Sequence, residues 1–208
     1  MNKKLDNSNE SLGNIIIISA PSGAGKTTIC RAVVDSSNNM KYSVSYTTRL
    51  SRKDEKNGRE YFFIDKTEFV KMIEEKKFAE WAKVHGNYYG TSKTFLDGVL
   101  KAGKNVLLEI DVQGGMNIKK QYPDACMIFI MVLDFGTLKK RLISRNEDCK
   151  ESAINLRLEN AKKELEFARE YEYLVINENL DEAVAAVKTI IKSLEYKILK
   201  NRKQKYFN

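Results

Sequence analysis

A glycine-rich segment directly after a short apolar run restricts the fold of this chain more than any other feature. The apolar run is Ile15–Ile18, and it is followed by Ser19-Ala20-Pro21-Ser22-Gly23-Ala24-Gly25-Lys26-Thr27-Thr28. A run of this kind predicts a buried strand, and the residues after the glycines are compatible with a helix. A strand, a glycine-rich turn and a helix, in this order, form the context in which a phosphate-binding loop works.

Each residue type in this loop suits the binding of a nucleotide triphosphate. Gly23 and Gly25 allow positive φ angles, which turn backbone N–H groups inward onto an oxyanion. The helix that follows adds the positive end of its dipole. Lys26 can reach the β- and γ-phosphates, and the Thr27 hydroxyl can bind Mg²⁺. We therefore predict ATP binding with Mg²⁺ as cofactor, although Ala20 stands where the strict motif has Gly; the predicted ATP-binding residues are Ala20, Pro21, Ser22, Gly23, Ala24, Gly25, Lys26, Thr27 and Thr28.

The rest of the chain alternates between predicted strands and predicted helices. Further apolar runs lie at Val106–Leu108, Met127–Leu133 and Tyr173–Ile176. Elsewhere apolar residues recur at steps of three and four, as on one face of a helix. These stripes are Ile154, Leu158, Ala161, Leu165 and Ala168, and then Leu180, Val184, Val187, Ile191, Leu194 and Ile198. The alternation predicts an α/β fold with a central, mostly parallel sheet flanked by helices.

Two stretches interrupt this alternation and suggest a division of the chain. From Thr47 to about Leu96 the sequence is polar and aromatic, which favours a small mixed α+β insertion. From about Gly136 to Arg169 it is highly charged and helical, which favours a mobile cap or lid. We therefore predict a disordered tail (1–13), a core (14–46, 97–135 and 170–208), an insertion (47–96) and a lid (136–169).

Composition narrows the class of protein only slightly. The formal charge of +8 favours an anionic partner, which could be a nucleotide, a nucleic acid or an acidic lipid. No apolar run approaches the roughly 20 residues of a membrane-spanning helix. Cys30, Cys126 and Cys149 are odd in number and lack metal-ligand spacing, which favours reduced thiols. We expect a cytoplasmic protein that does not bind membranes.

Several spaced blocks accompany the phosphate loop and together resemble one family. They are Ser43-Val44-Ser45-Tyr46-Thr47-Thr48-Arg49; Arg52 with Glu55, Gly58, Tyr61 and Phe63; Glu80-Trp81-Ala82; Gly86-Asn87-Tyr88-Tyr89-Gly90-Thr91; and Glu109-Ile110-Asp111-Val112-Gln113-Gly114. From about Ile15 to Ile191 the chain resembles the guanylate kinase family, a group of phosphate-loop nucleoside monophosphate kinases. The resemblance implies a core, a GMP-binding insertion (47–96) and a lid, and transfer of a phosphoryl group from ATP to GMP.

The resemblance also implies which residues bind GMP, and their chemistry agrees. The phosphate would be held by guanidinium forks and tyrosine hydroxyls. Guanine presents two adjacent N–H donors, and a single carboxylate can accept from both. Glu109 stands where the family often carries Asp, and it would contact guanine or its waters. The implied GMP-binding residues are Ser45, Arg49, Arg52, Tyr61, Glu80, Tyr89, Thr91 and Glu109.

The remaining implied residues belong to the donor side. Phosphoryl transfer needs alignment and positive charge around the moving group. Arg141 and Arg145 lie four apart, on one face of a helix, and Arg157 follows on the next helix. With Lys26 they are the implied catalytic residues. Asp111 would support Mg²⁺, partly through water, together with Thr27, and Asn177 is a candidate for contact with the base of ATP.

Several alternatives stay open at this level. The chain could phosphorylate another nucleoside monophosphate, or it could be a non-catalytic guanylate-kinase-like module that binds proteins. A module of that kind would be expected to lose the loop lysine or the lid arginines, which this chain keeps. The basic stretch Lys197–Lys205 is better explained as a solvated helix than as a nucleic-acid site. His85 is expected to be a loop residue, and the protein could be a monomer or a homodimer.

Overall fold

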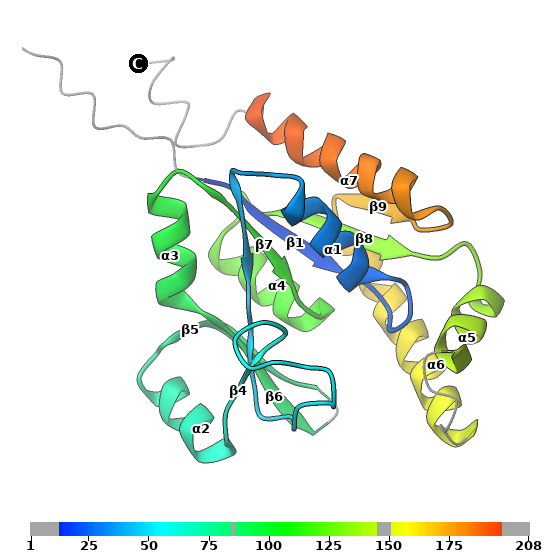
Figure 1. Ribbon diagram of the computed structural model, residues 1–208, viewed down its shortest axis with the longest axis horizontal. Helices are drawn as coiled ribbons and strands as arrows, with labels where there is room; N and C mark the ends of the chain where they lie inside the picture. Colours follow the sequence, from blue (N-terminus) through cyan, green and yellow to red (C-terminus); the bar gives the residue numbers. More distant parts are fainter. Residues whose placement is uncertain (1–12, 85, 145–150, 197–208) are drawn as a thin grey trace, which may run out of the picture.

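The core of the computed structural model, which describes residues 13–84, 86–144 and 151–196, is a five-stranded parallel sheet (Figure 1). The strands run in the order β2-β7-β1-β8-β9, and each neighbouring pair is parallel. Their bounds are β1 Ile15–Ser19, β2 Met40–Ser43, β7 Asn105–Glu109, β8 Cys126–Met131 and β9 Tyr173–Ile176. The predicted α/β fold with a mostly parallel sheet is confirmed.

The isoleucine run of β1 is apolar throughout because both faces of the core sheet are covered. Ile16 and Ile18 pack in one buried cluster, while Ile15 and Ile17 pack in another on the opposite face. The first cluster includes residues of α1 (Lys26–Asp35) and α7 (Leu180–Ser193). The second cluster includes residues of α3 (Lys93–Lys101) and α4 (Val112–Gln121). Helices therefore flank the sheet on both sides, and the C-terminal stripe of α7 docks on the core.

Strand β2 is the one strand of the core sheet that we did not predict. It lies at the edge of the sheet, where it pairs with β7 alone. Met40 and Ser43 are buried, while Lys41 is exposed and Tyr42 is half-buried. An edge strand covered on one face needs no continuous apolar run, so hydrophobicity gave no signal for it.

A second, four-stranded sheet is built from the aromatic insertion, below the core sheet in Figure 1. Its order is β4-β3-β6-β5, with β3 Tyr46–Thr47, β4 Phe62–Phe63, β5 Phe78–Val84 and β6 Asn87–Ser92; helix α2 is Lys66–Glu74. The rings of Phe69 and Phe78 stack with centroids 4.5 Å apart, and Phe69 is fully buried. Gly90 lies against them, since a Cβ there would come within 2.8 Å of Phe78. Aromatic side chains thus form the small core of this part.

The charged segment after β8 is helical, as predicted, and lies at the lower right of Figure 1. It contains α5 (Phe135–Ser144) and α6 (Glu151–Glu166), followed by the short helix η1 (Phe167–Glu170); a second short helix, η2 (Leu194–Tyr196), follows α7. Ile154 and Ala161 of the predicted stripe are buried. Ala168 was predicted in the same helix but belongs to η1, because the helix tightens after Glu166.

Some predictions fall on residues outside the described ranges. These are most of the tail (1–12), His85, Arg145, Cys149, Ile198 and the basic stretch 197–205. Gly13, which we placed in the tail, donates its backbone N–H to the Leu100 carbonyl at 3.1 Å. Within the described chain, no helix has the length and apolar character needed to cross a membrane. Cys30 is a buried reduced thiol, and Cys126 is also buried.

Candidate functional site

The predicted phosphate loop connects β1 to α1 with the expected geometry. Gly23 and Gly25 have φ angles of 90° and 89°, in the left-handed region that glycine adopts readily. Ala24 is fully buried and donates its N–H to the Pro21 carbonyl at 3.1 Å. The loop therefore has the tight turns that direct backbone N–H groups toward a bound anion.

Helix α1 differs from its neighbours at its N-terminus. Helices α2, α3, α4 and α7 are each capped by a side chain, from Asp65, Ser92, Asp111 and Asn179. Helix α1 begins after Gly25, which has no side chain and leaves the first N–H groups without a side-chain acceptor. Uncapped N–H groups and the positive end of the helix dipole suit a phosphate group at this position.

Lys26 and Thr27, the first residues of α1, face the end of β7. The Lys26 Nζ donates to the Ile110 carbonyl at 3.2 Å. The Thr27 hydroxyl donates to Oε1 of Glu109 at 2.5 Å. A hydroxyl and a carboxylate therefore lie side by side at the start of the helix, next to the loop. Oxygen ligands of this kind are those that Mg²⁺ prefers.

Glu80, on β5, is a buried carboxylate in the second sheet. It is 6% exposed and accepts a hydrogen bond from the Thr91 hydroxyl at 2.6 Å. Burial raises the pKa of Glu80 to about 7; the Thr91 hydrogen bond opposes this rise, and the charge of Asp111 adds to it. Thr91 is fully buried and Ser45 is 7% exposed. The three residues that we expected at the guanine edge are thus all withdrawn from solvent.

The carboxylates of Asp111 and Glu109 make contacts in different parts of the site. Asp111 caps α4 by accepting from the Gly114 N–H at 3.0 Å. A Cβ built on Gly114 would lie 2.9 Å from Glu80 Oε2 and 3.1 Å from Asp111 Oδ1, so both carboxylates flank this glycine. Asp111 therefore lies beside Glu80, while Glu109 contacts Thr27. Thr27 thus contacts Glu109 directly, and the expected roles of Asp111 at Mg²⁺ and of Glu109 at the base stay predictions.

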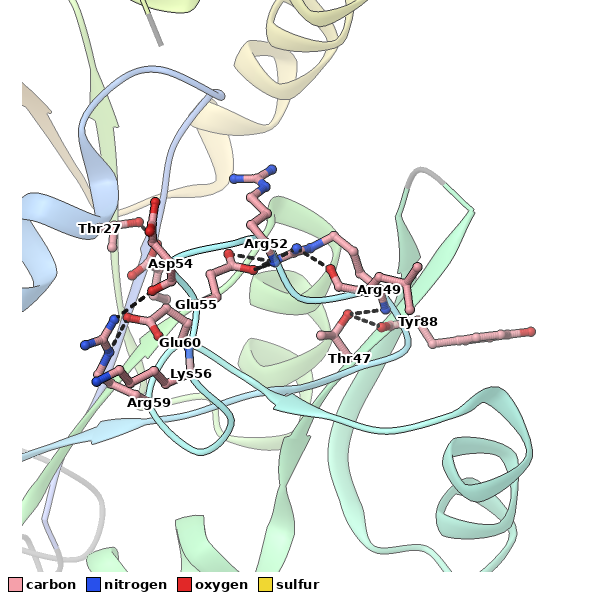
Figure 2. Close-up of polar contacts among 12 residues, drawn as sticks. Thr27, Thr47, Arg49, Arg52, Asp54, Glu55, Lys56, Arg59, Glu60 and Tyr88 are labelled. Atoms are coloured by element: carbon pink, nitrogen blue, oxygen red, sulfur yellow. Dashed lines mark hydrogen bonds and ion pairs between the residues drawn. The ribbon is translucent and has the colours of Figure 1, made fainter. Parts of the chain in front are cut away.

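The two predicted phosphate-binding arginines differ in their contacts: Arg49 is paired with a carboxylate, whereas the Arg52 side chain is exposed (Figure 2). Arg49 donates to both carboxylate oxygens of Glu55, at 2.9 and 2.8 Å, and its guanidinium lies 5.3 Å from the centroid of the Tyr61 ring. Burial alone would raise the pKa of Glu55. Hydrogen bonds from Arg49 and from the Arg52 backbone outweigh this effect, so the pKa lies below its ordinary value. The side chain of Arg52 is exposed and points away from this pair. Arg49 is therefore held in place, and Arg52 is available to an incoming anion.

A cavity of about 480 Å³ brings the separate predictions together. It is lined by residues of the phosphate-loop helix, the second sheet, the end of β7 and α6. Predicted residues in its lining are Thr27, Arg49, Arg52, Tyr61, Tyr89, Glu109 and Arg157. Lys26, Ser45, Glu80, Thr91 and Asp111 lie outside its lining, and Arg145 lies outside the described residues.

Asn177 supports the phosphate loop from the far side. Its side-chain amide donates to the Ala24 carbonyl at 2.7 Å, and its backbone carbonyl accepts from Arg141 Nη2 at 3.0 Å. Asn177 is 5% exposed, and a Cβ on Gly25 would collide with its amide. The Asn177 amide therefore holds the phosphate loop, and the contact that we expected with the base of ATP stays a prediction. The same contacts link Arg141 of α5 to the loop.

Sequence reasoning did not identify some residues at this site. Arg31, Tyr42 and Asn160 line the cavity, and Arg31 donates to Glu60 at 2.7 Å. Glu164 on α6 is affected by the charges of Lys26 and Asp111; burial raises its pKa to about 7, against the effect of Lys26. Arg31 was detectable, since it lies four residues, about one helical turn, after Thr27. The others carry no local motif.

The raised pKa of Glu80 predicts how stability depends on pH. Because the folded chain holds this proton up to pH about 7, against an ordinary value of 4.5, folding opposes ionisation. The free energy of unfolding should fall as pH rises between these values, by about 3 kcal/mol for this group. Urea unfolding of the ligand-free protein at pH 5 and pH 8 measures this loss. Glu80→Gln, which cannot ionise, should lose about 3 kcal/mol less; identical pH profiles for the two proteins would contradict the assignment.

Comparison with known proteins identifies relatives along nearly the whole chain. The sequence model of one family, described as guanylate kinase, matches residues 12–194. A guanylate kinase of Thermotoga maritima is 43% identical over 190 residues, which cover 91% of each chain. One of Syntrophotalea carbinolica is 45% identical over 179 residues, covering 86% of this chain and 85% of that one. The crystal structure of guanylate kinase from Anaplasma phagocytophilum matches with a TM-score of 0.77 at 28% identity, covering 95% of this chain and 97% of that one.

Proposed function

Because the chain belongs to the guanylate kinase family, it transfers a phosphoryl group from ATP to GMP, and we propose that its two substrates meet in the cavity described above. The observation that carries this proposal is the composition of the lining. Thr27 of the phosphate-loop helix, Arg49 and Tyr89 of the insertion and Arg157 of α6 all face one space. A donor site and an acceptor site are therefore adjacent, as direct transfer requires.

The GMP phosphate is bound by the arginines and tyrosines of the insertion. Arg49 and Arg52 supply positive charge, and Tyr61 and Tyr89 supply hydroxyl donors from the same wall of the cavity. Burial raises the pKa of Tyr61 to about 12, so this hydroxyl keeps its proton at neutral pH. Glu55 holds the Arg49 guanidinium by its two terminal nitrogens, which leaves other N–H groups for the phosphate.

The guanine edge is read by the buried carboxylates beyond the cavity. Glu80 accepts from the two adjacent N–H donors of guanine, and Asp111 adds a second negative charge beside it. Those donors lower the pKa of Glu80 on binding, so GMP and the ionised carboxylate favour one another. Adenine presents an acceptor at N1 instead, which would leave the carboxylate unpaired at a cost of about 1–3 kcal/mol or more.

The ATP phosphates bind to the loop from Ala20 to Thr28. The N–H groups at the start of α1 and the Lys26 ammonium hold the β- and γ-phosphates. An oxygen of the GMP phosphate attacks the γ-phosphorus, and the bond to the β-phosphate oxygen breaks as charge accumulates on that oxygen. Lys26, Arg141 and Arg157 stabilise this charge. Arg145 is proposed for the same role from the sequence alone.

The oxygen ligands beside the loop fit Mg²⁺. Thr27 and Glu109 would hold the ion, which neutralises charge on the β- and γ-phosphate oxygens when bound. Asp111 caps α4 and lies beside Glu80, so we assign it to the guanine side instead. We therefore propose roles for the two acids that are exchanged relative to the expectation from sequence.

Two neutral substitutions separate these roles. Asp111→Asn keeps an N-cap for α4 but removes a carboxylate acceptor from the proposed guanine side, so the KM for GMP should rise roughly tenfold while the Mg²⁺ concentration for half-maximal rate stays the same. Glu109→Gln should leave the KM for GMP unchanged and raise the Mg²⁺ concentration for half-maximal rate roughly tenfold. Steady-state kinetics at several Mg²⁺ concentrations measures both. The opposite pattern would restore the original assignment.

An acceptor panel tests the proposed function as a whole. ADP release from ATP is followed with GMP, dGMP, AMP, dTMP and CMP at the same concentration. We expect the highest kcat/KM for GMP and detectable turnover of dGMP. Equal rates for AMP and GMP, or no acceptor-dependent ADP release, would contradict the assignment of the cavity.

We further propose that residues 47–96 act as the GMP-binding domain and residues 136–169 as the lid, around the core. The protein is expected to work in the cytoplasm, where ATP and GMP are available, without nucleic acid or membrane. A monomer or a homodimer is compatible with a cavity lined by one chain.

A further inference from the structure

We propose that Tyr42 is a positioning residue that fixes the carboxylate of Glu109 against the phosphate-loop helix. The inference rests on the proposed role of Thr27 and Glu109 at the magnesium-bound triphosphate. Tyr42 belongs to β2, the strand that carried no sequence signal, and none of the motif blocks contains it. Its role follows from its contacts in the folded chain.

The Glu109 carboxylate is held by two hydroxyl groups, one on each oxygen. The Tyr42 hydroxyl donates to Oε2 at 2.8 Å, and the Thr27 hydroxyl donates to Oε1 at 2.5 Å. The three side chains come from β2, β7 and α1. One carboxylate thus joins an edge strand to the first turn of the phosphate-loop helix.

The register of the core sheet explains why these side chains meet. Tyr42 pairs with Leu107 across β2 and β7, and Glu109 follows Leu107 by two residues. Side chains two apart on a strand point to the same face, so Tyr42 and Glu109 both lie on the face of α1. Leu107 packs in the buried cluster on that face, with Tyr42 against its border. The contact is therefore built into the sheet.

The length of the Glu109 side chain explains why a second hydrogen bond is needed to fix it. Compared with Asp, Glu has an additional methylene group with one more rotatable bond. An unheld Glu side chain would sample several rotamers, only some of which place Oε1 next to Thr27. The hydroxyl of Tyr42 restricts it to one of them.

Binding of ADP with and without Mg²⁺ tests this role apart from turnover. Calorimetry gives the Kd for ADP in Mg²⁺ and in EDTA, and their ratio measures the contribution of the ion. Tyr42→Phe should reduce this ratio about tenfold, with ADP binding in EDTA unchanged. In kinetics, kcat should fall while the KM for GMP stays constant. An unchanged ratio would overturn the proposal.

A double-mutant cycle shows whether Tyr42 acts through Glu109. Tyr42→Phe should have no effect on the ratio in the Glu109→Gln background. Because Tyr42 also lines the cavity, it could contact GMP directly; an equal rise in the KM for GMP in both backgrounds would establish that role and overturn ours. If Glu109→Gln alone leaves the ratio unchanged, the proposed magnesium role of Glu109 fails instead.

Control variants exclude an effect of folding. Tyr196→Phe removes a hydroxyl from a side chain that is 79% exposed, and it should leave the ratio unchanged. Urea unfolding compares the stability of each variant with the parent protein. A reduced ratio in Tyr42→Phe that is restored by a second, stabilising substitution elsewhere would show a merely structural role and overturn the proposal.

Discussion

Replacing Lys26 by alanine is expected to lower kcat about a thousandfold or more while leaving the fold intact. The ammonium group lies at the first turn of α1, where it contacts the Ile110 carbonyl at 3.2 Å. One hydrogen bond donated to a carbonyl leaves its remaining N–H donors for the phosphates. Its charge is needed most when negative charge develops on the bridging oxygen, so kcat should fall more than the affinity for ATP. Single-turnover rates with saturating ATP and GMP measure this effect.

The control is Lys120→Ala, which removes an exposed lysine from α4 far along the chain from the loop. It should have the kcat of the parent protein. Circular dichroism and the unfolding midpoint should be unchanged in both variants, because Lys26 has no buried salt bridge among the described residues. Near-normal turnover in Lys26→Ala would remove the lysine from the transition state.

Replacing Glu80 by alanine is expected to abolish most of the preference for GMP over AMP. The side chain is buried, and it contacts Thr91 inside the second sheet. A site built to accept hydrogen bonds from guanine should lose about a hundredfold or more in kcat/KM for GMP when its acceptor is removed. The value for AMP should change little or rise, since the unpaired carboxylate no longer opposes it. The ratio of the two kcat/KM values is the measured quantity.

Two further variants make the result interpretable. Glu74→Ala removes an exposed carboxylate from α2, in the same part of the chain, and should leave the ratio unchanged. Glu80→Gln keeps the shape of the side chain and can still accept from Thr91, but it replaces one acceptor oxygen with a donor. It should lose GMP preference with its fold preserved. A specificity ratio that stays constant in Glu80→Gln would exclude this residue from base recognition.

Most of the core sheet and the phosphate loop could be predicted from local sequence. Buried parallel strands are apolar on both faces, so β1, β7 and β8 each left a continuous run. The edge strand β9 also left one, although three of its four residues are exposed. The loop requires glycine at positions of positive φ, and Gly23 and Gly25 adopt them. These are features that neighbouring residues determine, and the chain shows them directly.

The positions of Glu109 and Asp111 could not be predicted, because they depend on where β7 ends. The strand stops at Glu109, and the chain turns before Asp111, which caps α4. Two residues that would share a face on a continuous strand therefore point to different parts of the site. Sequence reasoning places a strand end only to within a few residues, and that end decides which part of the site each carboxylate faces.

Contacts between distant segments were also beyond the sequence. The amide of Asn177 reaches Ala24 across 153 positions, and Tyr42 reaches Glu109 across 67. Each depends on the order of strands in the sheet rather than on a motif. The resemblance to a family supplied the list of residues around GMP, but only the folded chain shows that Glu55 already holds Arg49.

The most direct test of this account is a crystal structure of the protein with GMP bound. It predicts that guanine N1 and N2 lie within hydrogen-bonding distance of the Glu80 carboxylate, with the GMP phosphate on Arg49 and Arg52 and directed at the loop around Lys26. A structure in which GMP leaves Glu80 unoccupied, or in which its phosphate binds elsewhere than these arginines, would contradict the account.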